Sequence, residues 1–332
     1  MSDIYAVIGL GSMGKRRVRD LKALEAGRVI GVDLREDRRQ ETEDKFKIEV
    51  SDDLEAVLSL KPRVLFVSVA PHLHYRFCKA ALDAGSAYFV ECLTTLSLEE
   101  MDDLIERDKR SAGRAFPSVT PFMNGYFQHT AQAVAQFGKV YAIDASMASW
   151  LPNQHPWEKQ IGEHYEFDRG KGGGLAEPAY LLSWICGLLG QKPTSVIAHA
   201  EHVSDLPPGV NDLLDMIIQF DRGTVMNFHY SLCEKQDRSV GTFTRISCER
   251  GTTLSKNTES RFFNWDTQKW DECTLPGSWT YEDIYVEEMK HVLAALDGKE
   301  DYQGSLERER WTLATLLAAE ESSRKGQRVT IG

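Results

Sequence analysis

The sequence has no apolar run long enough to cross a lipid bilayer. The apolar stretch at residues 181–189 is about half as long as the roughly 20 residues that a membrane helix needs. The amino-terminal residues also lack the basic segment and cleavage-like site of a secretory signal, and they lead at once into a strand-like run. We therefore expect a soluble, cytoplasmic protein with no membrane partner.

Cysteine and positive charge are also scarce. None of the six cysteines belongs to a CxxC pair, which argues against a structural zinc site or a redox dithiol and favours thiols in a reducing compartment. The chain has 39 Lys and Arg residues but 50 Asp and Glu residues, and the resulting net charge of −11 repels the phosphate backbone of nucleic acids. His, Asp and Glu show no tight metal-ligand spacing. We expect neither a nucleic-acid partner nor a metal.

What the sequence does contain, over residues 1–120, is an alternation of strands and helices. Apolar runs that are typical of strands lie at residues 5–8, 29–32, 64–69 and 87–90. Helical patterns separate them; Ser51 is the expected cap of a helix over 52–60, and Ser97 with Glu100 forms a capping box for a later one. This order predicts parallel βαβ units, and hence an α/β Rossmann domain with a parallel, doubly wound sheet.

After residue 120 strands follow one another more directly. They are expected at residues 140–150, 195–202, 216–220, 225–232, 243–248 and 253–255, with helices at 175–189, 281–296 and 305–324. Residues 225–232 alternate between apolar and polar, as in a sheet with one face against helices. We predict an α+β domain over 121–332 with a large, mostly antiparallel open sheet. Its uncovered face would support a homodimer or homotetramer.

A glycine-rich turn opens the first helix. It reads Gly9-Leu10-Gly11-Ser12-Met13-Gly14, and Asp33 follows Gly9 by 24 residues (33 − 9) at the end of the second strand. GxGxxG alone is a weak signal, but this context completes the dinucleotide fingerprint. Gly11 would let backbone amides approach the pyrophosphate, and Asp33 would bind the adenosine ribose. Because a carboxylate repels a 2′-phosphate, we expect NAD rather than NADP, although Arg35 could hold that phosphate instead.

Ligands of doubly wound sheets bind at the carboxyl ends of the strands. Besides the glycine turn, we therefore expect the residues that follow two later strands to line the cofactor site. They are Ser68, Val69, Pro71 and His74 after one strand, and Glu91 and Cys92 after the next. Lys15 or Arg17, in the first helical turn, could reach the phosphates, or both could be solvated.

Over nearly its whole length the chain resembles the glucose–fructose oxidoreductase, inositol dehydrogenase and MocA family (Gfo/Idh/MocA). Besides the glycine turn, the resemblance rests on Pro71-His72-Leu73-His74, Glu91-Cys92-Leu93, Gly172-Gly173-Gly174 before an apolar helix, and the tail at 322–326. It implies an NAD(P)-dependent oxidoreductase that acts on a sugar, sugar nucleotide or sugar-derived acid. Residues 151–158 are similar to members found beside surface-sugar pathways, which suggests surface polysaccharide biosynthesis.

Two residues that this resemblance calls for are replaced. Cys92 stands where the family's Glu-Lys-Pro motif has the lysine that orients substrate, and a thiol cannot replace an ammonium's three donors. Glu177 and Tyr180 stand where the family carries an Asp and an acid/base His. The proton group is then Tyr180 or, in the aromatic loop, His155. Glu177 would orient Tyr180 or bind a sugar hydroxyl, and Cys92 would be a spectator.

Three functions remain open at this point. The first is the sugar oxidoreductase, and the second is an NAD-binding partner or regulator without dehydrogenase activity, which the replacement of Lys and His favours. The third is an NAD-dependent lyase or glycosidase that uses transient oxidation. The cofactor motif is compatible with all three.

Overall fold

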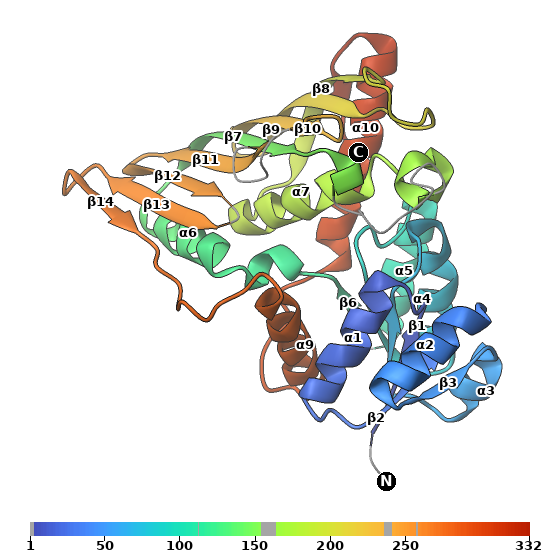
Figure 1. Ribbon diagram of the computed structural model, residues 1–332. Coiled ribbons are helices and arrows are strands. Elements are labelled where there is room, and N and C mark those ends of the chain that lie inside the picture. The colour runs from blue at the N-terminus through green and yellow to red at the C-terminus, as the bar shows by residue number, and fades with distance from the viewer. Residues whose placement is uncertain (1–2, 112, 154–163, 236–240, 257) are drawn as a thin grey trace. The chain divides into compact units, whose positions relative to one another are not determined.

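The computed structural model describes residues 3–111, 113–153, 164–235, 241–256 and 258–332, and the chain divides into two compact units (Figure 1). The first contains Met1–Thr120 and Thr280–Arg310, and the second contains Pro121–Trp279 and Trp311–Gly332. A single division at residue 120 would leave 280–310 in the second unit. The structure groups this segment with the first because its helix contributes Met289 and Val292 to that unit's core.

A parallel sheet forms the centre of the first unit. Its strands are β1 (Ile4–Ile8), β2 (Arg28–Val32), β3 (Glu49–Ser51), β4 (Val64–Val67), β5 (Ala87–Val90) and β6 (Ala115–Pro117). They lie in the order β3-β2-β1-β4-β5-β6, and every neighbouring pair is parallel. Every residue of β4 and β5 is buried, as continuous apolar runs predict. The predicted Rossmann class is confirmed.

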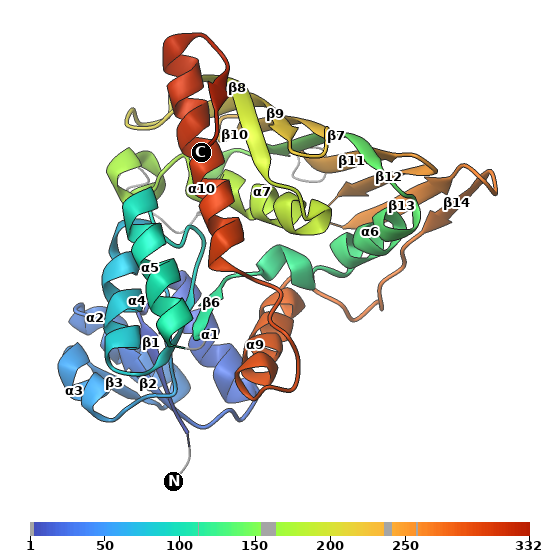
Figure 2. The same cartoon turned by 180° about the vertical axis from the view of Figure 1, so that it is seen from behind.

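Helices cover both faces of this sheet (Figures 1 and 2). They are α1 (Ser12–Ala23), α2 (Glu36–Phe46), α3 (Leu54–Ser59), α4 (His74–Asp83), α5 (Leu98–Arg110) and α9 (Asp283–Leu296), with a 3₁₀ turn η1 (Pro71–Leu73) before α4. Ser97 caps α5 as predicted, accepting a hydrogen bond from the Glu100 amide. The predicted cap of α3 is wrong. Asp53 accepts the Ala56 amide at 3.0 Å, whereas Ser51 ends β3.

The second unit is built on a nine-stranded sheet with the order β14-β13-β12-β11-β7-β10-β9-β8-β15. Its strands are β7 (Val140–Ala148), β8 (Pro193–Glu201), β9 (Leu213–Phe220), β10 (Val225–Ser231), β11 (Thr242–Cys248), β12 (Gly251–Lys256), β13 (Glu259–Asn264), β14 (Lys269–Glu272) and β15 (Val329–Thr330). Among the described strand pairs of this second sheet, only β7 with β10 is parallel. The mostly antiparallel sheet is therefore confirmed.

The helices of this unit that the structure describes in full are α6 (Gly125–Gln136), α7 (Ala176–Leu189) and most of α10 (Leu306–Lys325), with 3₁₀ turns η2 (Thr120–Met123), η3 (Leu151–Asn153), η5 (Tyr165–Phe167) and η6 (Arg169–Lys171). α6 and α7 lie on one face of the sheet (Figure 1). In β10 the residues Met226, Phe228 and Tyr230 are buried, while Val225 and Asn227 are exposed, so the predicted alternation is present. No helix in the described part of the chain has the length and hydrophobicity of a membrane span.

Candidate functional site

The glycine turn between β1 and α1 uses two of its glycines for packing. Gly9 has a φ of +88°, and a Cβ there would lie 2.6 Å from the Ser68 carbonyl oxygen. A Cβ on Gly14 would lie 1.7 Å from the Gly9 carbonyl oxygen. Side chains at these positions would break the contact of the turn with its own helix and with the end of β4.

Gly11 has a different environment from Gly9 and Gly14. The nearest atom to a Cβ at this position is a side-chain nitrogen of Arg38, 3.7 Å away, and no backbone atom lies within 4 Å. Gly11 is the N-cap of α1, so Ser12, Met13 and Gly14 carry the first amides of that helix. Open space at the positive end of a helix fits a pyrophosphate group. The turn therefore fits the cofactor that the fingerprint predicts.

Asp33 follows β2 and its carboxylate is held in place by two backbone amides. The Leu10 amide donates to Oδ2 at 2.7 Å and the Arg35 amide to Oδ1 at 2.9 Å. The Arg35 side chain is instead paired with Asp37, and the guanidinium beside Asp33 is that of Arg38, 3.6 Å from Oδ2. The position fits a ribose-binding carboxylate, and Arg38 rather than Arg35 is the cation nearest to it.

The residues after β4 and β5 are brought together as the topology predicts. The Ser68 hydroxyl lies 3.4 Å from Glu91 Oε1, and Val69 contacts the glycine turn. His74 is fully buried below them, with its ring nitrogens 2.6 Å from the Leu93 carbonyl oxygen and 2.8 Å from that of Val69. Burial lowers the pKa of His74. Its side chain has no exposed surface for a ligand, so it positions the two strand ends.

Pro71 is buried and begins η1, directly after the same strand end. Its ring fixes the backbone at the first position of a helical turn, where no amide is needed. Pro71 therefore shapes the path of the loop that the sequence places beside the cofactor.

Arg17 does not point to a phosphate site, so this sequence interpretation is wrong. The side chain is fully buried and donates to both oxygens of Glu91, at 2.7 and 3.0 Å, while Nη2 lies 2.8 Å from Glu288 Oε2. Lys15, the other candidate, is paired with Glu41 at 2.7 Å. The Glu91 carboxylate is thus engaged inside the first unit, directly before Cys92.

Cys92 is 8% exposed. Burial raises the pKa of its thiol well above the ordinary value, and the carboxylates of Glu309, Glu91 and Glu288 raise it further. The thiol therefore stays protonated at neutral pH and is a poor proton acceptor. The peptide bond between Cys92 and Leu93 is cis.

In the second unit, the three glycines before α7 bring a short 3₁₀ segment onto the start of that helix. A Cβ on Gly173 would lie 2.3 Å from the Glu166 carbonyl oxygen, while Gly172 and Gly174 have φ values of +105° and +73°. Glu177 lies in the first turn of α7, and the Tyr230 hydroxyl of β10 is 3.5 Å from its Oε2. The glycine run thus places the backbone of Glu166 next to the helix that carries Glu177.

Glu166 is a site residue that the sequence reasoning missed. Its side chain is buried, accepts a hydrogen bond from Tyr165 and lies 3.9 Å from Nδ1 of His164. Burial and the neighbouring Glu177 raise its pKa to about 9. An acidic residue between Tyr165 and Phe167, just before a glycine run, is the only sequence signal that it offers.

The predicted proton groups are only partly located by the structure. Tyr180 is half-buried on α7, three residues after Glu177 and therefore on a neighbouring position of the same helix face. His155 lies outside the described residues. Among the residues that the structure does describe, no group of three or more His, Cys, Asp or Glu side chains is placed to hold a metal ion.

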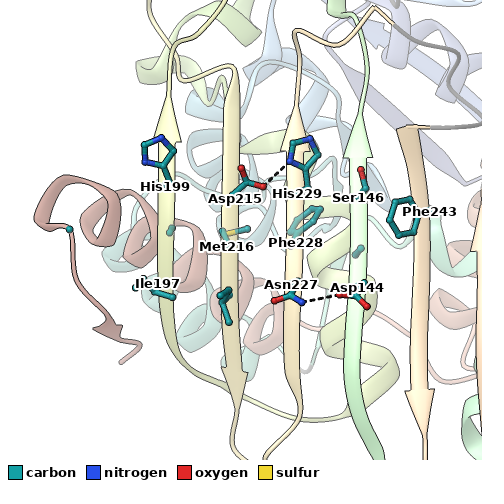
Figure 3. Close-up of a pocket in the computed structure, with 14 residues that line it drawn as sticks. Asp144, Ser146, Ile197, His199, Asp215, Met216, Asn227, Phe228, His229 and Phe243 are labelled. Carbon is teal, nitrogen blue, oxygen red and sulfur yellow. Dashed lines mark hydrogen bonds and ion pairs between the residues drawn. The ribbon is translucent and has the colours of Figure 1, made fainter.

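A hollow of about 700 Å³ lies on the face of the nine-stranded sheet that points away from α6 and α7, which we call the outer face (Figure 3). His199, Asp215, His229, Ser146 and Phe243 form one row across five strands, in register. The ring of His229 contacts Asp215 at 2.8 Å. In β10 the side chain of His229 points to the hollow, and that of the next residue, Tyr230, points to the opposite face and to Glu177 on α7. The hollow and the carboxyl groups of Glu166 and Glu177 therefore lie on opposite faces of the sheet.

A doubly wound sheet in this strand order, with a glycine turn at the start of α1 and a fixed carboxylate at the end of β2, defines a dinucleotide-binding protein. A model of an oxidoreductase family with an NAD-binding Rossmann fold matches residues 4–117, and a GFO/IDH/MocA C-terminal domain model matches residues 127–254. The chain belongs to the GFO/IDH/MocA family of NAD-binding oxidoreductases. This finding confirms the resemblance read from the motifs.

Solved structures of low sequence identity share the fold. An oxidoreductase domain protein from Kribbella flavida is 16% identical, with a TM-score of 0.86 and 100% of both chains covered. The WlbA dehydrogenase from Bordetella pertussis, in complex with NADH and UDP-GlcNAcA, is 15% identical, with a TM-score of 0.81 and coverage of 100% of this chain and 98% of that one.

The UDP-N-acetylglucosamine 3-dehydrogenase GnnA from Acidithiobacillus ferrooxidans is 17% identical, with a TM-score of 0.80, and the match covers 98% of this chain and 99% of that one. No curated protein matches the sequence.

Proposed function

We propose that the protein is an NAD-dependent oxidoreductase that acts on a sugar, a sugar nucleotide or a sugar-derived acid. The observation that carries the proposal is the open space at Gly11 together with the Asp33 carboxylate, which fit NAD. The names of two structural neighbours, a UDP-N-acetylglucosamine 3-dehydrogenase and a dehydrogenase bound to UDP-GlcNAcA, support a sugar nucleotide. Surface polysaccharide biosynthesis is the corresponding process.

Oxidation of an alcohol requires a group that accepts the hydroxyl proton within hydrogen-bond distance. Bound NAD would supply the electron acceptor, and the chain must supply the proton acceptor. Cys92 is unsuited to this role because its thiol is buried and its pKa is raised. The candidates are Glu177 and Tyr180 at the start of α7, with His155 in the preceding loop.

A non-catalytic NAD-binding protein is the second candidate function. It is favoured by the residue at position 92, where a buried thiol stands in place of the lysine that the family resemblance implies. In that case the protein would act as a partner or regulator whose state depends on bound NAD.

The two candidates are separated by measuring NADH absorbance with a panel of sugar nucleotides and nonulosonic acids, alongside NAD binding by calorimetry on the same preparation. NADH formation with any member of the panel supports the oxidoreductase. Tight NAD binding without turnover on the whole panel favours the non-catalytic function. No affinity for NAD or NADP would contradict both.

We also propose that the protein forms a homodimer or homotetramer through the outer face of the nine-stranded sheet. Ile197, Ile217, Val225 and Phe243 are exposed there on four different strands. An apolar surface of this kind on a soluble protein is typical of an interface. A second copy of the chain presents the same apolar residues, and two such faces would cover each other about a twofold axis.

A further inference from the structure

We propose that Glu166 is a positioning residue that holds a proton against Glu177, so that Glu177 serves as the proton acceptor of the reaction. The proposal rests on the oxidoreductase function proposed above and assigns a residue that none of the motifs includes. Glu177 is the group that would touch substrate. Glu166 would act through it.

The first step of the argument is placement. Glu166 sits in η5, whose backbone packs so closely on Gly173 that a Cβ there would lie 2.3 Å from the Glu166 carbonyl oxygen. The Glu166 side chain is buried at 5% exposure, and it interacts electrostatically with the carboxyl group of Glu177. Two carboxyl groups are therefore held beside the first turn of one helix.

The second step concerns the surrounding groups. Tyr165 donates a hydrogen bond to Glu166, and Nδ1 of His164 lies 3.9 Å from Glu166 Oε2. From β10 the Tyr230 hydroxyl reaches Oε2 of Glu177 at 3.5 Å. Burial raises the pKa of Tyr230 well above its ordinary value, so this phenol remains a hydrogen-bond donor.

The third step is charge. Two neighbouring carboxyl groups, one of them buried and the other half-buried, cannot both ionise at low cost, so the pair keeps one proton at neutral pH. Glu166 is 5% exposed whereas Glu177 is only half-buried, so burial penalises the charge of Glu166 more and the proton stays on Glu166. Burial, followed by the charge of Glu177, accordingly raises the pKa of Glu166 to about 9. Glu177 then carries the negative charge and accepts a hydrogen bond from Tyr230, which prefers the ionised carboxylate as its acceptor.

The step that follows is balanced. The hydroxyl proton of the substrate would pass to the Glu177 carboxylate. NAD⁺, held by the glycine turn and Asp33, would supply the acceptor for the hydride that leaves the same carbon, so that the C–O bond becomes a carbonyl. Glu177 then releases its proton to water. Glu166 keeps its own proton throughout, and its neutrality lets Glu177 be ionised at neutral pH.

The proton on Glu166 can be tested without a substrate, by infrared difference spectroscopy of the full-length protein between pH 7 and pH 10. We expect the wild type to lose a protonated-carboxyl carbonyl band with a midpoint near pH 9. Glu166→Gln should lack this component. Glu320→Gln, which removes a carboxylate paired with Arg169 in the same unit, should retain it. An unchanged band in Glu166→Gln would overturn the inference.

The role of the pair is tested with whichever sugar nucleotide turns over. Glu166→Gln imitates the protonated acid but cannot lose a proton, so the transition near pH 9 should disappear from its profile of kcat/KM against pH. Glu177→Gln should lower kcat by about 10²–10⁴. A Glu177→Gln enzyme with wild-type kcat would refute the assignment of the acceptor.

Failure of the inference and failure of the proposed function give different results. Turnover together with an unaltered infrared band in Glu166→Gln refutes the inference alone. In the second case, the infrared band vanishes in Glu166→Gln and the protein binds NAD, but no member of the panel is oxidised. This result refutes the oxidoreductase function and the role of Glu177 as proton acceptor. The proton on Glu166 would still be established.

Discussion

At the scale of single residues, Gly11 and Gly14 belong to the same turn but leave different room for a side chain. We expect Gly11→Val to fold, because no backbone atom lies within 4 Å of its Cβ position, and to abolish NAD binding by filling the pyrophosphate space. Calorimetric titration with NAD checks this. Gly277→Val, also at an open position, is the matched control and should bind normally. NAD binding by Gly11→Val would exclude the proposed position of the pyrophosphate.

We expect Asp33 to govern the choice between NAD and NADP. Its carboxylate repels a 2′-phosphate, so Asp33→Asn should narrow the ratio of the two dissociation constants by about tenfold, which corresponds to roughly 1.4 kcal/mol. Arg35→Ala should not change the ratio because Arg35 is paired with Asp37. Wild-type protein that binds NADP as tightly as NAD would contradict the argument and point to Arg38, the guanidinium beside Asp33.

We expect Glu166 to make the stability of the protein depend on pH. Its pKa is raised from the ordinary glutamate value to about 9 by burial, so folding takes up a proton between these two values. Its contribution is therefore fully present below the unfolded pKa and is lost as the pH rises through the folded pKa, with a limit of about 1.4 kcal/mol per pH unit for one proton.

The consequence is measurable in urea unfolding at pH 6, 7, 8 and 9. In Glu166→Gln the decrease in unfolding free energy with pH should be shallower than in the wild type, by up to about 1 kcal/mol per unit. Glu320→Gln should follow the wild type. Parallel curves for Glu166→Gln and the wild type would mean that Glu166 is ionised in the folded protein.

The site residues show which features a sequence can predict. The glycine turn and Asp33 could be predicted as a cofactor site because their chemistry depends on neighbours within one βαβ unit. Arg17, His74 and Glu166 depend on partners that the fold brings from elsewhere: Glu288, the Leu93 carbonyl and Glu177. No local pattern distinguishes a buried, ion-paired Arg17 from an exposed arginine on a helix.

At the scale of elements, Arg17 joins α1 to the end of β5 and to α9. It contacts Glu91 and Glu288, and all three side chains are buried. Loss of the Arg17 guanidinium would leave the buried carboxyl groups of Glu91 and Glu288 without their positively charged partner. Arg17→Met should therefore destabilise the first unit by about 3–5 kcal/mol. Arg17→Lys should recover only part of this loss because an ammonium cannot bind Glu91 through two fixed donors.

The measurement for Arg17 is urea unfolding followed by a probe in the first unit. Arg28→Met is the matched control, because Arg28 forms an exposed pair with Glu49, and it should shift the transition far less. Equal shifts of the urea transition in Arg17→Met and Arg28→Met would show that the buried ion pairs of Arg17 add no more to the free energy of unfolding than an exposed ion pair does.

Elements at the sheet edge were the hardest to predict. The strands β13 and β14 were missed, although β7 to β12 were located to within a few residues. Every residue of β14 is exposed, so neither of its faces imposes an apolar alternation. Residues 259–264 and 269–272 contain charged and amide side chains that a solvated edge tolerates. Burial creates the pattern from which strands are recognised, and it is lowest at the edge.

At the scale of the whole molecule, the outer face of the nine-stranded sheet determines the assembly that we expect. Light scattering at micromolar concentration should give the mass of a dimer or tetramer. Ile217→Asp places a charge in the middle of the exposed apolar residues and should shift the protein to monomer. Val203→Asp changes an apolar residue that is outside the strands and at least as exposed as Ile217, and it should keep the wild-type mass. A monomeric wild type would remove the case for this interface.

The chain passes between its two units three times, after Thr120, Trp279 and Arg310, and this order affects folding during synthesis. Glu288, which closes the buried cluster around Arg17, is made 271 residues later (288 − 17). At about 5–20 residues per second, this interval lasts roughly 15–50 s on the ribosome. The amino-terminal half of the protein therefore leaves the exit tunnel early but waits for one of its own helices, and that interval is when it is most exposed to misfolding and chaperones.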